Sequence, residues 1–204
     1  QGGSGARFQR ECVTPNGRRA ARTQTAHILA LYVQLGPEAD RERTVQTLLT
    51  RLEEQDGHLV TGFVGTPYFC HALSENGQAD AAWQLLMKED FPSWLYQVKA
   101  GATTIWEHWD GVKPDGTMWS PDMNSFNHYA YGAIGEWLYR AAAGINTEEE
   151  APGFKRSVIH PIPGGNLQWL KAHYASVYGD IGVSWALASA QEGQMVTLEV
   201  AIPA

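Results

Sequence analysis

The chain has 204 residues, which is enough for one large domain or for one domain with a smaller one beside it. Hydrophobic residues make up 44% and charged residues 18%, so a sizeable core can form and the composition argues against wholesale disorder. The net charge of −7 disfavours nucleic acid or an anionic membrane surface as a partner, and no stretch of about 18 apolar residues could span a bilayer.

The first 21 residues are predicted to form a flexible N-terminal segment. Their Gly-rich opening, QGGSGARF, lacks the apolar core of a signal peptide, and the absence of an initial Met suggests a start within a longer protein. Cys12 and Cys70 show no CxxC spacing, which indicates neither a zinc site nor a disulfide framework. One bridge between the two thiols stays possible, so the compartment stays open.

Helical periodicity dominates residues 22–143. Turns containing glycine separate the helices at LGPE (35–38), QDGH (55–58) and ENGQ (75–78). Short turns between successive helices predict stacked helical hairpins. Apolar residues recur at i, i+3, i+4 and i+7 in three segments: Ile28, Leu31, Tyr32 and Leu35; Val45, Leu48, Leu49 and Leu52; and Ala79, Ala82, Trp83 and Leu86.

The helical periodicity stops at residues 101–123, which are predicted to form a turn-rich loop. A long loop between packed helices more often has a function than not. A strong helix is expected over residues 124–143, with His128, Gly132 and Gly135 on one face at i, i+4 and i+7. Each glycine inside a helix costs about 1 kcal/mol relative to alanine. Their presence indicates that something approaches the backbone closely there.

The polar and acidic residues 144–153, GINTEEEAPG, are predicted to form a linker. Over residues 154–204 the period changes to two, in SVIHPI, WLKAHYASVYG, IGVSWALAS and QMVTLEVAI. This pattern predicts a small antiparallel sheet that resembles part of a sandwich, with a turn at AQEGQ (190–194) between the last two strands. The expected fold class is therefore mainly α with a C-terminal β part.

Glu107 is the candidate for chemistry, because it lies within ATTIWEHWD (102–110) between Trp106 and His108, shortly before Trp109. A carboxyl group beside apolar rings loses hydration, and a carboxyl group held in this way can act as a general acid or base. Glycoside hydrolysis needs two such groups. From these residues alone, pairing with an arginine or capping of a helix is the favoured role for Glu107. Likewise, the Trp-rich clusters are either core or a stacking surface for sugars.

Other catalytic signatures are absent from the sequence. It contains no GxxxxGK[ST] phosphate loop, no GxGxxG, no HExxH and no GxSxG elbow. The seven histidines are scattered. We therefore expect neither a metal site nor a cofactor.

The stretch AGATTIWEHWDG, followed by SFNHYAYGAIGEWLY, resembles the C-terminal part of bacterial α-L-rhamnosidases, glycoside hydrolase family 78. The resemblance covers roughly residues 22–190 and continues in TGFVGTPYFCHALSENGQADAAWQLL, DFPSWLYQVKAGATTIWE and IHPIPGGNLQWLKAHYASVYGDIGVSW. It implies the C-terminal part of an (α/α)6 barrel over residues 22–143, with an inverting active site, and a β-domain over residues 154–204.

The resemblance also implies roles for single residues. Glu107 corresponds to the general base that activates water, and His128 to the histidine that contacts bound rhamnose. Trp106 and Trp109 are further candidates for substrate binding, as stacking surfaces beside the base. The implied partner is a rhamnose-containing glycoside.

One departure from the family concerns its general acid, which belongs to an acidic motif upstream of this region. Residues 1–20 contain only Glu11 as an acid, and nothing in the spacing favours Asp110, Asp115 or Asp122 as a replacement. The chain is therefore expected to be a rhamnosidase fragment with little activity alone.

Two rival interpretations stay open. One is a sugar-binding or structural module without catalysis, and the other is an (α/α)6 hydrolase for a different sugar. In each case the chain would contain only part of the barrel, about half of it. The apolar face that normally packs against the other half would be unpaired, which predicts that copies of the chain associate through it.

Overall fold

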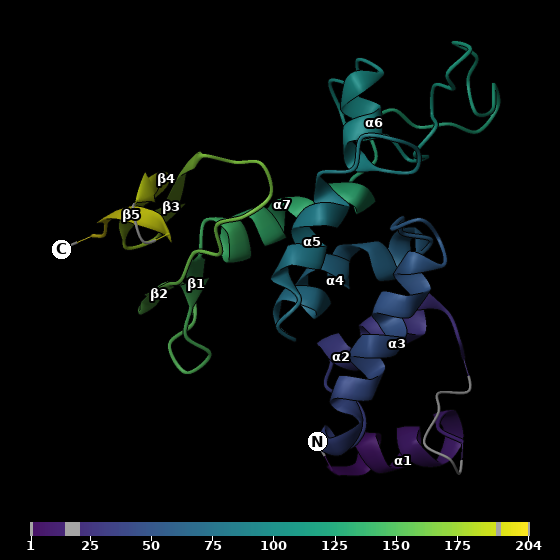
Figure 1. Cartoon of the computed structure of the whole chain (residues 1–204), viewed down its shortest axis with the longest axis horizontal. Coiled ribbons are helices and arrows are strands. Elements are labelled where there is room, and N and C mark those ends of the chain that lie inside the picture. Colours follow the sequence, from purple (N-terminus) through teal and green to yellow (C-terminus); the bar gives the residue numbers. More distant parts are fainter. Residues whose placement is uncertain (1, 15–20, 191–192, 204) are drawn as a thin grey trace. The chain divides into compact units, whose positions relative to one another are not determined.

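The computed structural model describes residues 2–14, 21–190 and 193–203 (Figure 1). The chain divides into two compact units, Gln1–Ala133 and Ile134–Ala204, which we call the helical unit and the C-terminal unit. All the labelled strands belong to the C-terminal unit, which confirms the expected fold class. In the described ranges, no helix combines the length and the apolar character that a bilayer span requires.

Helices of moderate length form the first unit, and glycines with positive φ end two of them. Gly57 (φ 74°) follows α3 and Gly77 (φ 76°) follows α4, as the predicted turns require. Helix α2 packs against α3 and α4, and α4 packs against α5. In chain order the elements are α1 (Gly2–Cys12), α2 (Gln24–Tyr32), the 3-10 helix η1 (Glu38–Asp40), α3 (Arg41–Glu53), α4 (Gly62–Ser74), α5 (Ala79–Leu86), α6 (Trp94–Lys99) and the 3-10 helix η2 (Ala130–Ala133).

A buried amide ties these helices together. The Gln24 side chain donates to the backbone oxygens of Arg51 (3.2 Å) and His58 (3.1 Å), and accepts from the Val60 N–H (2.8 Å). All the hydrogen-bonding groups of this amide are therefore in use, which removes the penalty of burying them. The start of α2 is thereby fixed against the end of α3 and the approach to α4. The apolar core around these helices includes Ile28, Leu48, Phe69, Leu73 and Trp83.

Residues 2–12, which the sequence assigned to a flexible segment over 1–21, form helix α1. Several strong helix formers lie in this stretch, and the Arg7–Glu11 ion pair (3.1 Å) spans one helical turn. Residues 15–20 of the same predicted segment lie outside the described residues. Cys12 and Cys70 are both free thiols, so they form no bridge.

The helix expected over residues 124–143 begins only with η2, so the prediction is wrong for the residues before it. There the His128 N–H donates to the oxygen of Ile105, and the Glu107 N–H donates to the oxygen of Ser125, both at 2.8 Å. These bonds connect two distant parts of the chain and occupy backbone groups that a helix would need. The predicted helical face shared by His128 and the two glycines is therefore not formed.

The C-terminal unit contains two antiparallel sheets, one of β1 and β2 and one in the order β3-β4-β5. Strand β1 lies within the predicted linker 144–153, and its three residues are too few to show a period of two. Of the turn expected at 190–194, residues 191 and 192 lie outside the described residues. The elements are α7 (Ile134–Trp137), the π-helical turn η3 (Leu138–Ala142), β1 (Ile145–Thr147), β2 (Ser157–Ile159), β3 (Trp169–Ser176), β4 (Gly179–Ala190) and β5 (Gly193–Ala201).

The core of this unit lies between β4 and the end of η3. Ile181 and Val183 of β4 pack with Ala143 and Ile145 and are fully or almost fully buried. The indole N–H of Trp185 donates to the oxygen of Ala142 (2.9 Å), which satisfies a helix-terminal carbonyl in the interior.

Gly144 is the tightest point of this unit. Its φ is 76°, a left-handed conformation that favours glycine, and its oxygen accepts from the His160 N–H (2.9 Å). A Cβ atom at this position would lie 2.1 Å from the backbone nitrogen of Pro161. Backbone atoms cannot rotate away as a flexible side chain can, so only glycine fits.

We expect Gly144→Ala to lower the free energy of unfolding of the C-terminal unit by more than about 3 kcal/mol, because a backbone clash adds to the left-handed cost of about 1–2 kcal/mol. Gly153→Ala is the matched control, since Gly153 has φ 74° but no atom within 4 Å of an added Cβ. Urea unfolding followed by far-UV circular dichroism measures both. Equal losses in the two variants would contradict the close approach at Gly144.

Candidate active site

The turn-rich residues 101–129 fold into an anchored loop between α6 and η2. Within it, the Lys113 N–H donates to the oxygen of Thr117 (2.8 Å) and closes a short hairpin. The Tyr96 hydroxyl of α6 donates to the oxygen of Val112 (3.1 Å). The first bond stabilises the loop internally, and the second ties its backbone to α6. The loop is therefore fixed on the helical framework.

Glu107 lies at the start of this loop with its side chain half-buried. The Ser125 N–H donates to its Oε2 (3.1 Å), while its own N–H donates to the Ser125 oxygen (2.8 Å). Among the described residues, no Lys or Arg lies within ion-pair distance of this carboxylate, and Oε1 has no hydrogen-bond partner. In the part of the chain that the structure describes, Glu107 therefore forms no ion pair with an arginine, which was one of the roles that its sequence neighbours favoured.

Tyr131 is buried, and the charge of Glu107 acts on its phenol. Burial raises the pKa of its phenol above the usual range, and the negative charge of Glu107 raises it further. Its ring lies flat on Trp109, with 3.8 Å between ring centres and 9° between planes. Tyr131 therefore stays a neutral hydroxyl within electrostatic reach of Glu107.

Trp106 and Trp109 are only 4% and 9% exposed. The Trp109 ring is covered by Tyr131 on one face and meets Trp94 edge to face at 5.3 Å. Trp106 meets Phe126 in the same way at 5.4 Å. Burial of both indoles favours the core role, which the sequence left open, over an exposed stacking surface for a sugar.

His128 is half-buried and lies within an aromatic stack. Its ring is parallel to those of Phe63 (4.7 Å, 17°) and Tyr129 (5.4 Å, 9°). The Ala130 N–H donates to its Nδ1 (3.3 Å), so in the neutral ring the proton lies on Nε2. His128 can therefore donate a hydrogen bond from Nε2, as contact with a sugar hydroxyl requires.

Among the described residues, no other carboxyl group of the loop contacts Glu107. Asp115 accepts from the Thr117 hydroxyl (2.7 Å) and N–H (2.9 Å), and these bonds hold the pKa of its exposed carboxyl below the usual range. A carboxyl group that stays ionised is a poor general acid. Within the described ranges, no group of three or more His, Cys, Asp or Glu side chains is placed to hold a metal ion.

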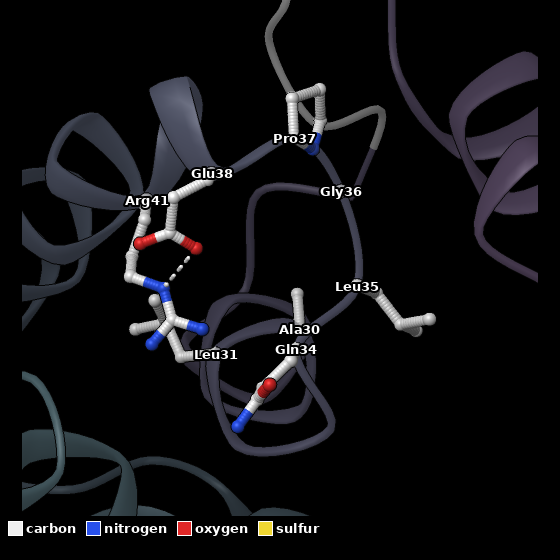
Figure 2. A pocket seen from close by; sticks show the side chains of 8 residues that line it. All are labelled: Ala30, Leu31, Gln34, Leu35, Gly36, Pro37, Glu38 and Arg41. Carbon is white, nitrogen blue, oxygen red and sulfur yellow. Dashed lines mark ion pairs between the residues drawn. The ribbon is translucent and has the colours of Figure 1, made fainter. Parts of the chain in front are cut away.

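The pocket in Figure 2 lies away from these residues in the sequence, where α2 ends and η1 begins. Its volume of about 20 Å³ has room for little more than one water molecule. The Glu38–Arg41 ion pair (3.2 Å, dashed in Figure 2) closes one side. The pocket contains none of the candidate residues and is too small for a sugar. It is lined by Ala30, Leu31, Gln34, Leu35, Gly36, Pro37, Glu38 and Arg41.

Two family models match consecutive parts of the chain. The bacterial alpha-L-rhamnosidase 6 hairpin glycosidase domain matches residues 4–142, and the bacterial alpha-L-rhamnosidase C-terminal domain matches residues 144–204. The chain belongs to the bacterial α-L-rhamnosidase family. The resemblance found in the sequence is thus confirmed, and the helical unit corresponds to part of a six-hairpin glycosidase domain.

Known α-L-rhamnosidases resemble the chain over most of its length. One from Streptomyces avermitilis is 42% identical over 181 residues, which are 87% of this chain and 17% of the relative. A crystal structure of S. avermitilis α-L-rhamnosidase complexed with L-rhamnose superposes with a TM-score of 0.87 at 40% identity, covering 95% of this chain and 18% of that one. The α-L-rhamnosidase from Aspergillus terreus gives a TM-score of 0.91 at 36% identity, over 98% of this chain and 23% of its own. The chain thus spans less than a quarter of the rhamnosidases it matches.

Three residues that contact Glu107, Trp109 or His128 were not singled out from the sequence. Ser125 acts through its backbone, so no side-chain pattern marks it. Tyr131 lies in FNHYAYG, the motif that pointed to His128, and could have been noticed from that position. Phe63 is far away in the sequence and reaches the site only because α4 folds beside η2.

We expect Trp109→Ala to lower the free energy of unfolding by about 3–5 kcal/mol, because it empties the space between Tyr131 and Trp94. Trp119→Ala is the control from the same loop. Its ring is 41% exposed and stacks only on His108, so we expect a loss of no more than about 2 kcal/mol. Urea unfolding followed by fluorescence compares them, and similar losses would show that Trp109 is not core.

The low pKa of Asp115 gives a test by pH titration. The shift stabilises the fold at pH values above the pKa that Asp115 has in the unfolded chain, and this stabilisation is lost as the pH falls through the folded pKa. Thr117→Val removes the hydroxyl donor, so we expect the pKa of Asp115 to rise towards its usual value in an NMR titration. Thr103→Val, at an exposed threonine of the same loop, should leave that pKa unchanged.

Proposed function

We propose that this chain supplies the general base and a sugar-contacting histidine of an inverting α-L-rhamnosidase, with Glu107 as the base and His128 as the contact. The observation that carries the proposal is the state of the Glu107 carboxylate. One oxygen is held by the Ser125 N–H, and the other is without a partner among the described residues. A base needs this combination of fixed orientation and an available lone pair. The substrate class is a terminal α-L-rhamnoside.

In this reaction Glu107 takes a proton from a water molecule whose oxygen attacks the anomeric carbon of the sugar. The glycosidic C–O bond breaks, its electron pair goes to the leaving oxygen, and a general acid protonates that oxygen. Inverting enzymes place the two carboxyl groups about 6.5–9.5 Å apart to leave room for the water. Because Asp115 is held ionised within its own hairpin, we propose that Asp115 is not this acid.

Two substrates separate the base from the acid. We expect the purified chain to hydrolyse methyl α-L-rhamnoside slowly or not at all, because the methoxide leaving group must be protonated and we assign no general acid among the described residues. α-L-Rhamnosyl fluoride needs no acid, because fluoride leaves unprotonated. We expect fluoride release, measured with an electrode, and a loss of at least about 100-fold in Glu107→Gln. The first sugar product in the NMR spectrum should have the inverted anomeric configuration.

Asp122→Asn is the matched control, since it also replaces a carboxylate of the same loop by an amide at an exposed position. It should leave fluoride release unchanged. Fluoride release that survives Glu107→Gln would remove Glu107 as the base. Turnover of the methyl glycoside at a rate close to that of the fluoride would place an acid within the chain.

The alternative is a sugar-binding module without catalysis, and the aromatic stack around His128 favours it as a second candidate. An imidazole donor beside an exposed ring binds a sugar without any acid or base. Calorimetric titration with L-rhamnose, next to the fluoride assay, separates the two. Binding without fluoride release supports the module.

Self-association through the incomplete barrel face stays a prediction. Exposed apolar side chains of the helical unit, such as Val60 and Val64, support it. We expect the average mass from light scattering to rise with protein concentration, because buried apolar area favours the associated form. A constant monomer mass across the series would remove this prediction.

A further inference from the structure

An exposed aromatic ring borders the carboxylate site. Phe63 is 42% exposed, yet its ring stacks on His128 at 4.7 Å and meets Tyr131 at 5.3 Å between ring centres. The His128 N–H donates to the Ile105 oxygen and the Glu107 N–H donates to the Ser125 oxygen, both at 2.8 Å, so the segments that carry His128 and Glu107 are paired. Phe63 is therefore in ring contact with His128, one of the two residues that the proposed function uses, and like Tyr129 it exposes part of its ring to solvent.

The position of Phe63 is fixed by the first turn of α4. The hydroxyls of Thr61 and Thr66, on either side of it, are hydrogen-bonded at 2.7 Å. At Gly65, an added Cβ would lie 2.8 Å from the Thr25 hydroxyl of α2, so the two helices approach closely there. A ring carried on so constrained a helix start has little conformational freedom left to lose when it binds a ligand.

The surroundings of Phe63 define the chemistry of the ligand. The ring offers only apolar surface, His128 Nε2 offers a hydrogen-bond donor, and Glu107 Oε1 offers an acceptor. A fitting molecule must therefore present C–H groups on one side and hydroxyl groups on the next, as a sugar does. A 6-deoxy sugar also has a methyl group, its most apolar part.

We propose that Phe63 packs against the C6 methyl group of the bound sugar and thereby selects a 6-deoxy sugar over the corresponding hexose. This inference rests on the proposed function, because it concerns the same site. A C6 hydroxyl in that place would lose its water and gain no hydrogen bond from the phenyl ring. The selectivity thus comes from desolvation of the wrong sugar and from packing of the right one.

L-Rhamnose and L-mannose provide the test, since they differ only in having a methyl or a hydroxymethyl group at C5. NMR titration of the full chain should show that L-rhamnose binds about tenfold more tightly than L-mannose. Phe63→Ala should weaken L-rhamnose binding by about tenfold and change L-mannose binding little. The discrimination between the two sugars should therefore disappear in this variant.

Two control variants keep the test specific. Phe63→Leu retains an apolar side chain and should retain most of the discrimination. Phe91→Ala removes another exposed phenyl ring of the helical unit, which is 50% exposed and packs edge-on against Tyr96, and should change neither affinity. Far-UV circular dichroism and thermal unfolding establish that each variant is folded before its affinities are compared.

Each other outcome overturns the inference in a recognisable way. Equal weakening of both sugars in Phe63→Ala would mean that the ring contacts the pyranose face and not the methyl group. Unchanged affinities, or no binding of either sugar to the wild type, would remove Phe63 from the site. The proposed function is tested separately, by whether fluoride release depends on Glu107. The role of Phe63 and the role of Glu107 can therefore fail independently.

Discussion

The pairing of residues 104–107 with residues 125–128 is the constraint on which the candidate site depends. Backbone bonds run in both directions between these segments, and the Ser125 N–H also binds the Glu107 carboxylate. The same pairing fixes His128 through its N–H bond to Ile105. A single set of main-chain contacts therefore orients the acid and places the imidazole, although the two lie in separate parts of the sequence.

Aromatic packing supports this pairing. The Trp94 indole donates to the oxygen of Tyr131 (2.8 Å) and meets Trp109 edge to face, while Trp109 lies flat on Tyr131. These contacts join α6, the loop and η2 into one interior. Trp106 and Trp109 are buried and form the apolar backing of the loop, whereas the rings of Phe63, Trp119 and Tyr129 are partly exposed.

Helices and strands with a regular apolar period were predictable from the sequence. Which backbone groups hydrogen-bond to each other across distant segments was not. The i, i+3, i+4, i+7 spacings located α2, α3 and α5, and the period of two located β3, β4 and β5. The stretch before η2 carries an equally helical spacing, but its backbone bonds go to the 104–107 segment instead. Composition likewise could not say which tryptophans are buried. The proposed role of Glu107 comes from the family resemblance, since its immediate neighbours fit a structural acid equally well.

The proposed base and a general acid depend on different parts of the protein. The hydrogen bonds of Glu107 itself come from Ser125 of the loop, Gln97 of α6 holds the backbone of Trp106 and His108 on either side, and the apolar backing comes from α6 and η2. None of these contacts requires a second carboxyl group. The orientation of the base is therefore a local property of residues 94–133, whereas the distance between the two carboxyl groups is a property of the assembled barrel. The hydrogen bond that orients Glu107 and the aromatic contacts of His128 and Phe63 are therefore present together in this chain, independently of any second carboxyl group.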